Sequence, residues 1–128
     1  MEIHICEGHS LFATKKETDY IPEYRGFYPP GRLAYEVREG LYTPDMLSKC
    51  QSVCEPLTSE KINELEKFIK EVADKLTEFG DRKEKERLIQ SLGRNTYYDV
   101  TKFNCVDFAE SLLKKYSGKT IIEAFREK

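Results

Sequence analysis

The sequence has little excess charge of either sign and no long hydrophobic run. Its 128 residues include 21 basic and 23 acidic side chains, which leaves a net charge of −2. Without a basic field, nonspecific binding of nucleic acid or anionic lipid is not expected. No stretch approaches the length of a membrane span, and the first residues lack the basic segment and apolar core of a conventional export signal. We therefore expect no nucleic-acid partner and no stable membrane insertion.

Cysteine is also scarce, and histidine scarcer still. The four cysteines are Cys6, Cys50, Cys54 and Cys105. Four are too few for a disulfide scaffold in a chain of this length, so a reducing compartment fits better. Cys50 and Cys54 have C-x3-C spacing, but a zinc site needs two more ligands and only His4 and His9 offer imidazole. We interpret this pair as small apolar side chains that could bond to each other if oxidised, with structural zinc as the minor alternative.

What is present is enough apolar material for a folded core. Hydrophobic residues make up 39% of the chain and aromatic residues 12%, beside 34% charged residues. This mixture is too apolar and too aromatic for a disordered chain. Single domains commonly contain roughly 100 to 150 residues. We therefore expect one globular domain over residues 1–128.

The N-terminal part predicts an antiparallel sheet. Residues 3–13 are β-branched and alternating, which indicates a first strand with His9 near its middle. The polar residues 15–18 predict a turn, residues 19–27 a returning strand, and residues 33–37 a third strand. On a single strand His4 and His9, five positions apart, would point to opposite faces.

The C-terminal half predicts two helices. From Thr58 to Gly80, apolar residues recur every three or four positions, which is typical of an amphipathic helix. The charged residues 81–87 are interpreted as a solvated helix face or a loop. A second helix follows Asn104, a good N-cap, and ends near Gly118.

The second helix begins with a cysteine, and this position has chemical consequences. Unpaired backbone N–H groups and the positive end of the helix dipole lower the pKa of a thiol placed there and favour the thiolate. The backbone N–H of Cys105 could also bind an oxyanion. Asp107 in the same turn would oppose thiolate formation unless an imidazolium outweighs it.

A thiolate nucleophile needs a proton acceptor, and only His4 and His9 can serve near neutral pH. Gly8 leaves space beside His9, whereas His4 lies nearer the terminus. We therefore favour His9 as general base. From composition and spacing alone, an ordinary buried Cys105 remains the alternative, since unreactive buried cysteines are common.

Three short motifs resemble a known superfamily. The segment YYDVTKFNCVDFAESLL (residues 97–113) resembles the cysteine motif of permuted papain-like hydrolases of the NlpC/P60, LRAT and PPPDE groups. GHSLFA (8–13) is similar to their Gly-His strand, and YRGFYPPG (24–31) to the Gly-Phe-Tyr-Pro turn of some bacterial members. Histidine before cysteine is the permuted order. The charged stretch 81–94 is longer than the family pattern suggests.

The resemblance implies an α+β fold, a small papain-like (NlpC/P60-like) domain in permuted order whose antiparallel sheet packs against the cysteine-bearing helix and the long amphipathic helix. It implies Cys105 as nucleophile and His9 as base, without metal or organic cofactor. Papain-like sites orient the imidazole with a polar residue on the next strand. With a turn at residues 15–18, residues near Glu23 and Tyr24 would lie opposite His9. We favour Glu23, with a simple solvated carboxylate as the alternative. Tyr97 or Tyr98 would line the cleft or pack in the core.

The function implied by the resemblance is that of a cysteine peptidase or amidase. The expected substrate is a peptidoglycan peptide or a protein, and the expected setting is that of a bacterial toxin or effector with an immunity protein as partner. Such an effector would be cytoplasmic in the producing cell and secreted without a conventional signal peptide. An LRAT-like acyltransferase or thioesterase, with an apolar groove, is one alternative. A non-enzymatic helical interaction domain with an exposed apolar stripe is the other.

Overall fold

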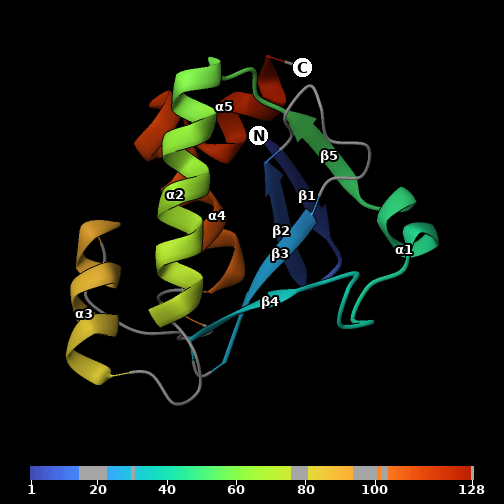
Figure 1. The fold of residues 1–128 in the computed structure, drawn as a ribbon. Helices are drawn as coiled ribbons and strands as arrows, with labels where there is room; N and C mark the ends of the chain where they lie inside the picture. Colours follow the sequence, from blue (N-terminus) through green and yellow to red (C-terminus); the bar gives the residue numbers. More distant parts are fainter. Residues whose placement is uncertain (15–22, 30, 76–80, 94–100, 102–103, 128) are drawn as a thin grey trace.

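The structure is a computed structural model that describes residues 1–14, 23–29, 31–75, 81–93, 101 and 104–127. Its centre is a five-stranded sheet in which every paired neighbour is antiparallel, with strand order β4-β3-β2-β1-β5 (Figure 1). The strands are β1 (Glu2–Cys6), β2 (His9–Thr14), β3 (Glu23–Tyr28), β4 (Arg32–Tyr35) and β5 (Gln51–Cys54). The α+β class with an antiparallel sheet is confirmed.

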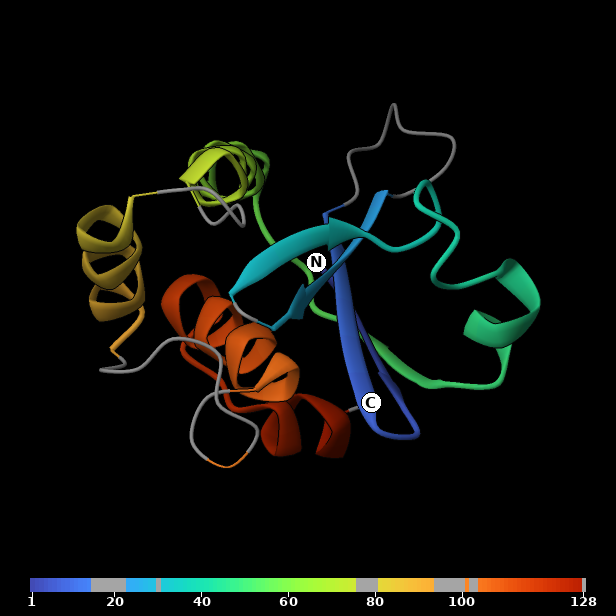
Figure 2. The same cartoon turned by 90° about the horizontal axis from the view of Figure 1, so that it is seen from below.

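The helices lie on both sides of this sheet (Figure 2). They are α1 (Pro44–Ser48), α2 (Ser59–Lys75), α3 (Arg82–Ser91), α4 (Cys105–Ser117) and α5 (Ile121–Arg126). Helices α2 to α5 occupy one side, and α1 lies on the other. The hydrophobic core therefore forms between the sheet and the larger helical layer, while the α1 side is covered by a short segment.

Stacked aromatic rings join α4 to the sheet. The ring of Phe108 lies 4.6 Å from that of Phe27 and 5.8 Å from that of Phe12, measured between centroids. All three side chains are buried. Aromatic pairs of this kind stabilise a fold by more than the burial of their surface area alone would. Because Phe108 is in the first turn of α4, the stacking holds the start of that helix against β2 and β3.

The expected first strand is in fact two strands. β1 and β2 form a tight hairpin around Glu7 and Gly8, and Gly8 has a φ of 74°, a conformation that favours glycine. His4 pairs with Leu11, and His9 lies two residues from Leu11 on β2. Since alternate residues share a face, His4 and His9 point to the same face of the sheet, and the expectation of opposite faces is wrong.

The helical expectations are met within the described residues. α2 begins one residue after Thr58, and α4 begins at Cys105 and ends before Gly118, whose φ is 71°. The stretch that follows Asp81 is a helix, with the Asp81 side chain as N-cap. The expected end of the long helix at residues 76–80 lies outside the described residues. No helix in the described part of the chain combines the length and apolarity needed to cross a membrane.

The cysteines pair differently from the sequence expectation. A disulfide joins Cys6 to Cys50, with 4.6 Å between their Cα atoms, whereas Cys54 is an exposed free thiol. The pairing of Cys50 with Cys54 is therefore wrong, because the antiparallel β1–β5 pair brings Cys6 close to the start of β5. Among the described residues no cluster could hold a metal ion. A disulfide is more typical of an oxidising environment than of the reducing compartment expected above.

Candidate active site

The start of α4 is fixed by a capping box. Asn104 Oδ1 accepts hydrogen bonds from the backbone N–H of Val106 at 3.0 Å and of Asp107 at 3.2 Å. Asp107 Oδ2 in turn accepts from the backbone N–H of Asn104 at 3.1 Å. This reciprocal arrangement makes Cys105 the first residue of the helix. It also engages the Asp107 carboxylate, which the sequence suggested would oppose a thiolate.

The structure brings Cys105 and His9 together. His9 begins β2, and its imidazole is hydrogen-bonded to the Cys105 side chain. Burial alone would lower the pKa of His9, but hydrogen bonds to Cys105 and Glu36 and the negative charge of both groups outweigh burial and raise that pKa to about 9. A protonated imidazole is therefore favoured at neutral pH.

The pKa of the Cys105 thiol shifts in the opposite direction to that of His9. Burial would raise its pKa, but the hydrogen bond and charge of His9, together with backbone N–H groups of Ser10 and Val106, outweigh burial and lower the pKa. Only 7% of Cys105 is exposed. A thiolate beside an imidazolium is the form of a cysteine nucleophile that attacks carbonyl carbon.

A third group, Glu36, completes the row. It follows directly after β4 and is fully buried, and its Oε1 lies 2.6 Å from His9 Nε2. Since Nε2 faces the carboxylate, it carries a proton and donates it in a hydrogen bond. The other ring nitrogen, Nδ1, is then the one available to the Cys105 sulfur. Cysteine, imidazole and carboxylate thus form a continuous row.

Two tyrosines pack against the imidazole. Tyr28, the last residue of β3, lies against the His9 ring at 4.8 Å, and Tyr42 stacks on it at 5.5 Å. Tyr42 is brought back by a turn in which the backbone N–H groups of Leu41 and Tyr42 donate to the carbonyl oxygen of Glu36, at 2.8 and 3.0 Å. The hydroxyl of Tyr28 donates to Glu36 Oε2 at 2.6 Å.

Gly26 leaves the space that this row occupies. A Cβ atom at position 26 would lie 1.7 Å from Glu36 Oε1 and 2.8 Å from His9 Nε2. Both distances are far below van der Waals contact. The Glu36–His9 hydrogen bond therefore requires glycine at this position, which gives a physical role to the first glycine of the YRGFYPPG motif.

Glu23 does not lie beside His9, so the structure does not support the expectation that Glu23 orients the imidazole. Its backbone pairs with Thr14, and its exposed side chain forms an ion pair with Arg38. The register differs because the β2–β3 connection spans residues 15–22 and is longer than the turn assumed from sequence. Continued along the strands, this register places Tyr28, and not Glu23, opposite His9.

Sequence reasoning missed Glu36 as a site residue, although one signal was present. Residues 33–37 were expected as a strand, on which Ala34 and Glu36 share a face. Ala34 pairs with Gly26. Glu36 therefore shares a face with Gly26 on the neighbouring strand. Sequence reasoning could have chosen Glu36 as the third site residue only if this β3–β4 register had been known. Tyr97 and Tyr98, the suggested cleft residues, lie outside the described residues.

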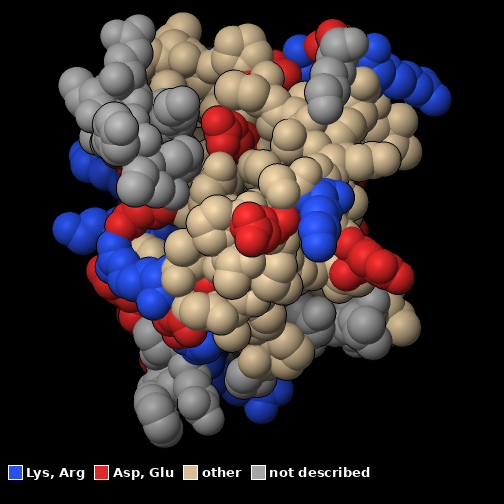
Figure 3. Space-filling view, turned by 90° about the vertical axis from the view of Figure 1, so that its right-hand side faces the viewer, with Lys and Arg blue, Asp and Glu red and all other residues tan. Residues whose placement is uncertain are grey.

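An apolar pocket lies on the face of the sheet that carries His9. It has a volume of about 400 Å³ and separates the sheet from the segment around α1. Its lining residues are His4, Tyr24, Val37, Pro44, Leu47, Ser48, Cys50 and Ser52. Figure 3 shows the side of the molecule where α1 lies, and charged side chains are scattered among uncharged ones there.

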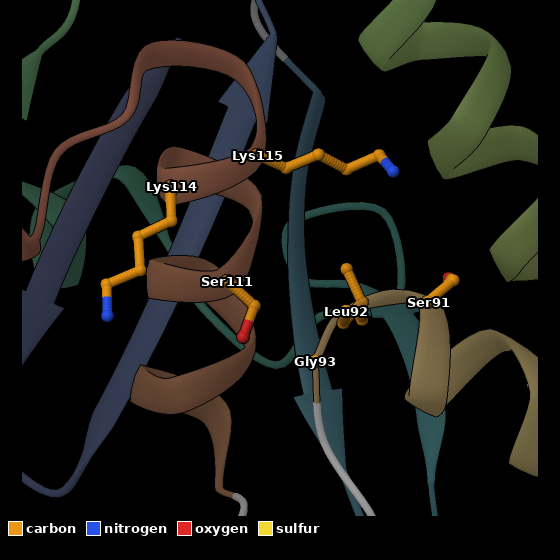
Figure 4. Close-up of a pocket in the computed structure, with 6 residues that line it drawn as sticks. All are labelled: Ser91, Leu92, Gly93, Ser111, Lys114 and Lys115. Atoms are coloured by element: carbon orange, nitrogen blue, oxygen red, sulfur yellow. The ribbon is translucent and has the colours of Figure 1, made fainter.

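A second pocket, of about 490 Å³, lies between the end of α3 and the C-terminal half of α4. Its walls include Leu92, Ser111, Lys114 and Lys115, and the two lysine side chains point in opposite directions (Figure 4). Diverging ammonium groups do not converge on one anion. This pocket therefore offers no chemistry comparable with that of the Cys105 row.

Comparison with known proteins adds no assignment. No protein-family model, no curated protein and no solved structure gave a significant match to the chain. Any conclusion about activity therefore depends on the geometry of these residues and on the motif resemblance.

Proposed function

We propose that this protein is a cysteine hydrolase of the permuted papain-like type that cleaves an amide bond through Cys105, His9 and Glu36. The observation that carries the proposal is the buried carboxylate–imidazole–thiol row, with 2.6 Å between Glu36 and His9. The raised pKa of His9 and the lowered pKa of Cys105 support the same ion pair. Perturbed groups that are coupled in this way are typical of active sites.

The mechanism is acyl transfer in two steps. The Cys105 thiolate attacks the carbonyl carbon, and the backbone N–H of Cys105, which has no acceptor within its own helix, stabilises the oxyanion. His9 gives its proton to the leaving amine as the C–N bond breaks. Water then attacks the resulting thioester, His9 takes one proton from that water, and the thiolate leaves. Glu36 orients the imidazole and stabilises its charged form.

The substrate class rests on the motif resemblance. A peptidoglycan peptide or a protein is the proposed target, and the bacterial toxin or effector setting would include an immunity protein as partner. The disulfide between Cys6 and Cys50 supports action in an oxidising space outside the cytoplasm. Delivery by a secretion apparatus would take the protein from the cytoplasm of the producing cell to that space.

One observation favours a second candidate function. The apolar pocket lies on the same face of the sheet as His9, although its lining does not include Cys105, His9 or Glu36, and it would suit the acyl group of an ester or thioester, which is the LRAT-like alternative. The helical interaction domain gains no such support. The apolar residues Leu65, Ile69 and Val72 of α2 are buried, so the exposed stripe that it requires is absent from the described part of this helix.

Purified peptidoglycan incubated with the protein, and analysed by mass spectrometry, tests the amidase proposal. We expect new cleaved peptides with the unmodified protein and with Cys54→Ala, which removes an exposed cysteine outside the site, and none with Cys105→Ala. Cleavage by Cys105→Ala would overturn the proposal. Turnover of p-nitrophenyl esters without any amide product, from peptidoglycan or from a protein substrate, would favour the acyl-ester candidate.

A further inference from the structure

We propose that Tyr28 is a positioning residue that acts on His9 through Glu36. Its hydroxyl holds the second carboxylate oxygen, so that the first oxygen stays aligned with the imidazole. This inference rests on the proposed function, since it concerns how the same row of groups is kept ready for reaction. The role proposed for Tyr28 is positioning, because its hydroxyl donates to Glu36.

The hydrogen-bond partners of Glu36 carry the argument. Its side chain is fully buried, and a buried carboxylate is costly unless both oxygens have partners. Oε1 lies 2.6 Å from His9 Nε2, and Oε2 accepts from the Tyr28 hydroxyl at 2.6 Å. Each oxygen therefore has one short, charge-assisted contact. Loss of the Tyr28 hydroxyl would leave Oε2 without its partner among the described side chains.

The position of Tyr28 fits this role. It ends β3 two residues after Gly26, so the two residues share the face on which Glu36 meets His9. The Tyr28 ring also lies against the imidazole at 4.8 Å. Burial and the hydrogen bond to Glu36 raise the pKa of Tyr28 well above its usual value, so the hydroxyl remains a donor. One side chain thus fixes both the carboxylate and the plane of the imidazole.

The effect on pH dependence has a definite sign. The groups that face the imidazole are Cys105 from α4, Glu36 and Tyr42 from the segment after β4, and Tyr28 from β3. In Tyr28→Phe the ring contact remains, but the carboxylate is less well held. The His9 imidazolium then loses support, its pKa falls, and the pKa of Cys105 rises because its cationic partner is weakened.

The chain provides a matched control in Tyr24. This residue is on the same strand and the same face, and its hydroxyl donates to Glu2 at 3.1 Å. Tyr24→Phe therefore removes a tyrosine–glutamate hydrogen bond that does not involve Glu36. A general effect of losing such a bond from β3 would be the same in both variants.

The experiment measures the rate of Cys105 alkylation by iodoacetamide between pH 4 and pH 10, site by site with mass spectrometry, in the full chain. We expect the midpoint of the rate profile to rise by about one pH unit in Tyr28→Phe and to stay unchanged in Tyr24→Phe. With a cleavable substrate, kcat should fall about tenfold in Tyr28→Phe with little change in KM. Equal midpoints in Tyr28→Phe and the unmodified protein would overturn the inference.

A double-variant comparison tests whether Tyr28 acts through Glu36. In a Glu36→Gln background, Tyr28→Phe should cause no further shift of the midpoint, and a full additional shift would contradict the inference. If Tyr28→Phe does not fold, Glu36→Gln alone must raise the midpoint, and an unchanged midpoint overturns the inference. Equal alkylation rates at Cys105 and exposed Cys54 in the unmodified protein would instead overturn the proposed function.

Discussion

The protein contains two histidine sites of similar composition on the same face of its sheet. His4 has Glu2 and Tyr24 as neighbours, and His9 has Glu36 and Tyr28. In each site the tyrosine hydroxyl donates to the glutamate. The two sites are therefore alike in residue types, and any difference in behaviour must come from geometry and from what lies beyond the three side chains.

The geometry differs in every contact. His4 Nε2 is 3.9 Å from the Glu2 carboxylate, whereas the corresponding distance from His9 to Glu36 is 2.6 Å. Burial outweighs Glu2 and lowers the pKa of His4, while His9 has a raised pKa. The Nδ1 atom of His4 is buried without a hydrogen-bond partner in the described residues. Carboxylate distance and the presence of Cys105 thus separate a neutral histidine from a charged one.

Replacing each histidine gives the largest expected difference between the two sites. His9→Ala should lower the rate of substrate cleavage by about 10³-fold, because in the proposed mechanism His9 forms the thiolate and protonates the leaving group. His4→Ala should lower that rate less than threefold. Steady-state kinetics of both variants, with circular dichroism to check folding, measures the difference. Comparable losses in two folded variants would contradict the assignment of His9 as the base.

Gly26→Ala tests the close contact between Glu36 and His9, which has no counterpart at the His4 site. The added Cβ would occupy the position of Glu36 Oε1, so we expect the carboxylate to move away from His9 and the cleavage rate to fall about 10²-fold. Gly40→Ala is the control. Gly40 has a φ of 75° and open space around it, so its replacement strains the backbone without a clash. Full activity in Gly26→Ala would mean that the Glu36–His9 contact is not needed.

The two histidine sites also show what sequence could predict. The start of α4 at Cys105 followed from a local signal, because Asn104 and Asp107 form a capping box within four residues. The histidine positions did not follow, because one positive-φ residue, Gly8, divides a continuous β pattern into a hairpin and changes which faces the side chains share. Local pattern alone is consistent with either arrangement.

Glu36 depended on information that is not local. Its position beside His9 requires the β2–β3 and β3–β4 registers together with the turn that follows Tyr35. An error in one connection length was enough to select Glu23 in its place. Hydrophobic periodicity determines which residues are buried, but it does not determine which buried polar residues meet across three strands.

The Cys6–Cys50 disulfide lies at the end of the β1–β2 hairpin that carries His9, and Cys50 also lines the pocket that His4 lines. Cys6 pairs with His9 in the β1–β2 ladder. The bond from Cys6 to Cys50 therefore ties this end of the hairpin to the connection between β4 and β5, which contains Glu36 and Tyr42. We expect Cys6→Ser combined with Cys50→Ser to lower the free energy of unfolding by about 2–4 kcal/mol. Chemical denaturation measures this change, with Cys54→Ser as control. A loss no larger than that of Cys54→Ser would remove any stabilising role for the bond.

The smallest expected change is a titration difference that can be measured without a substrate. NMR of the imidazole Cε1–H signals should give a midpoint near 9 for His9 and one below 6.5 for His4. The ion pair should therefore form only above the lowered pKa of Cys105, and it should be lost above about pH 9, where His9 loses its proton. In Cys105→Ala the His9 midpoint should fall, because a hydrogen bond and a negative charge that favour the imidazolium are gone, while that of His4 stays fixed. If both midpoints lie near 6.5, the two sites are electrostatically equivalent, and the thiolate–imidazolium pair is not the resting state at neutral pH.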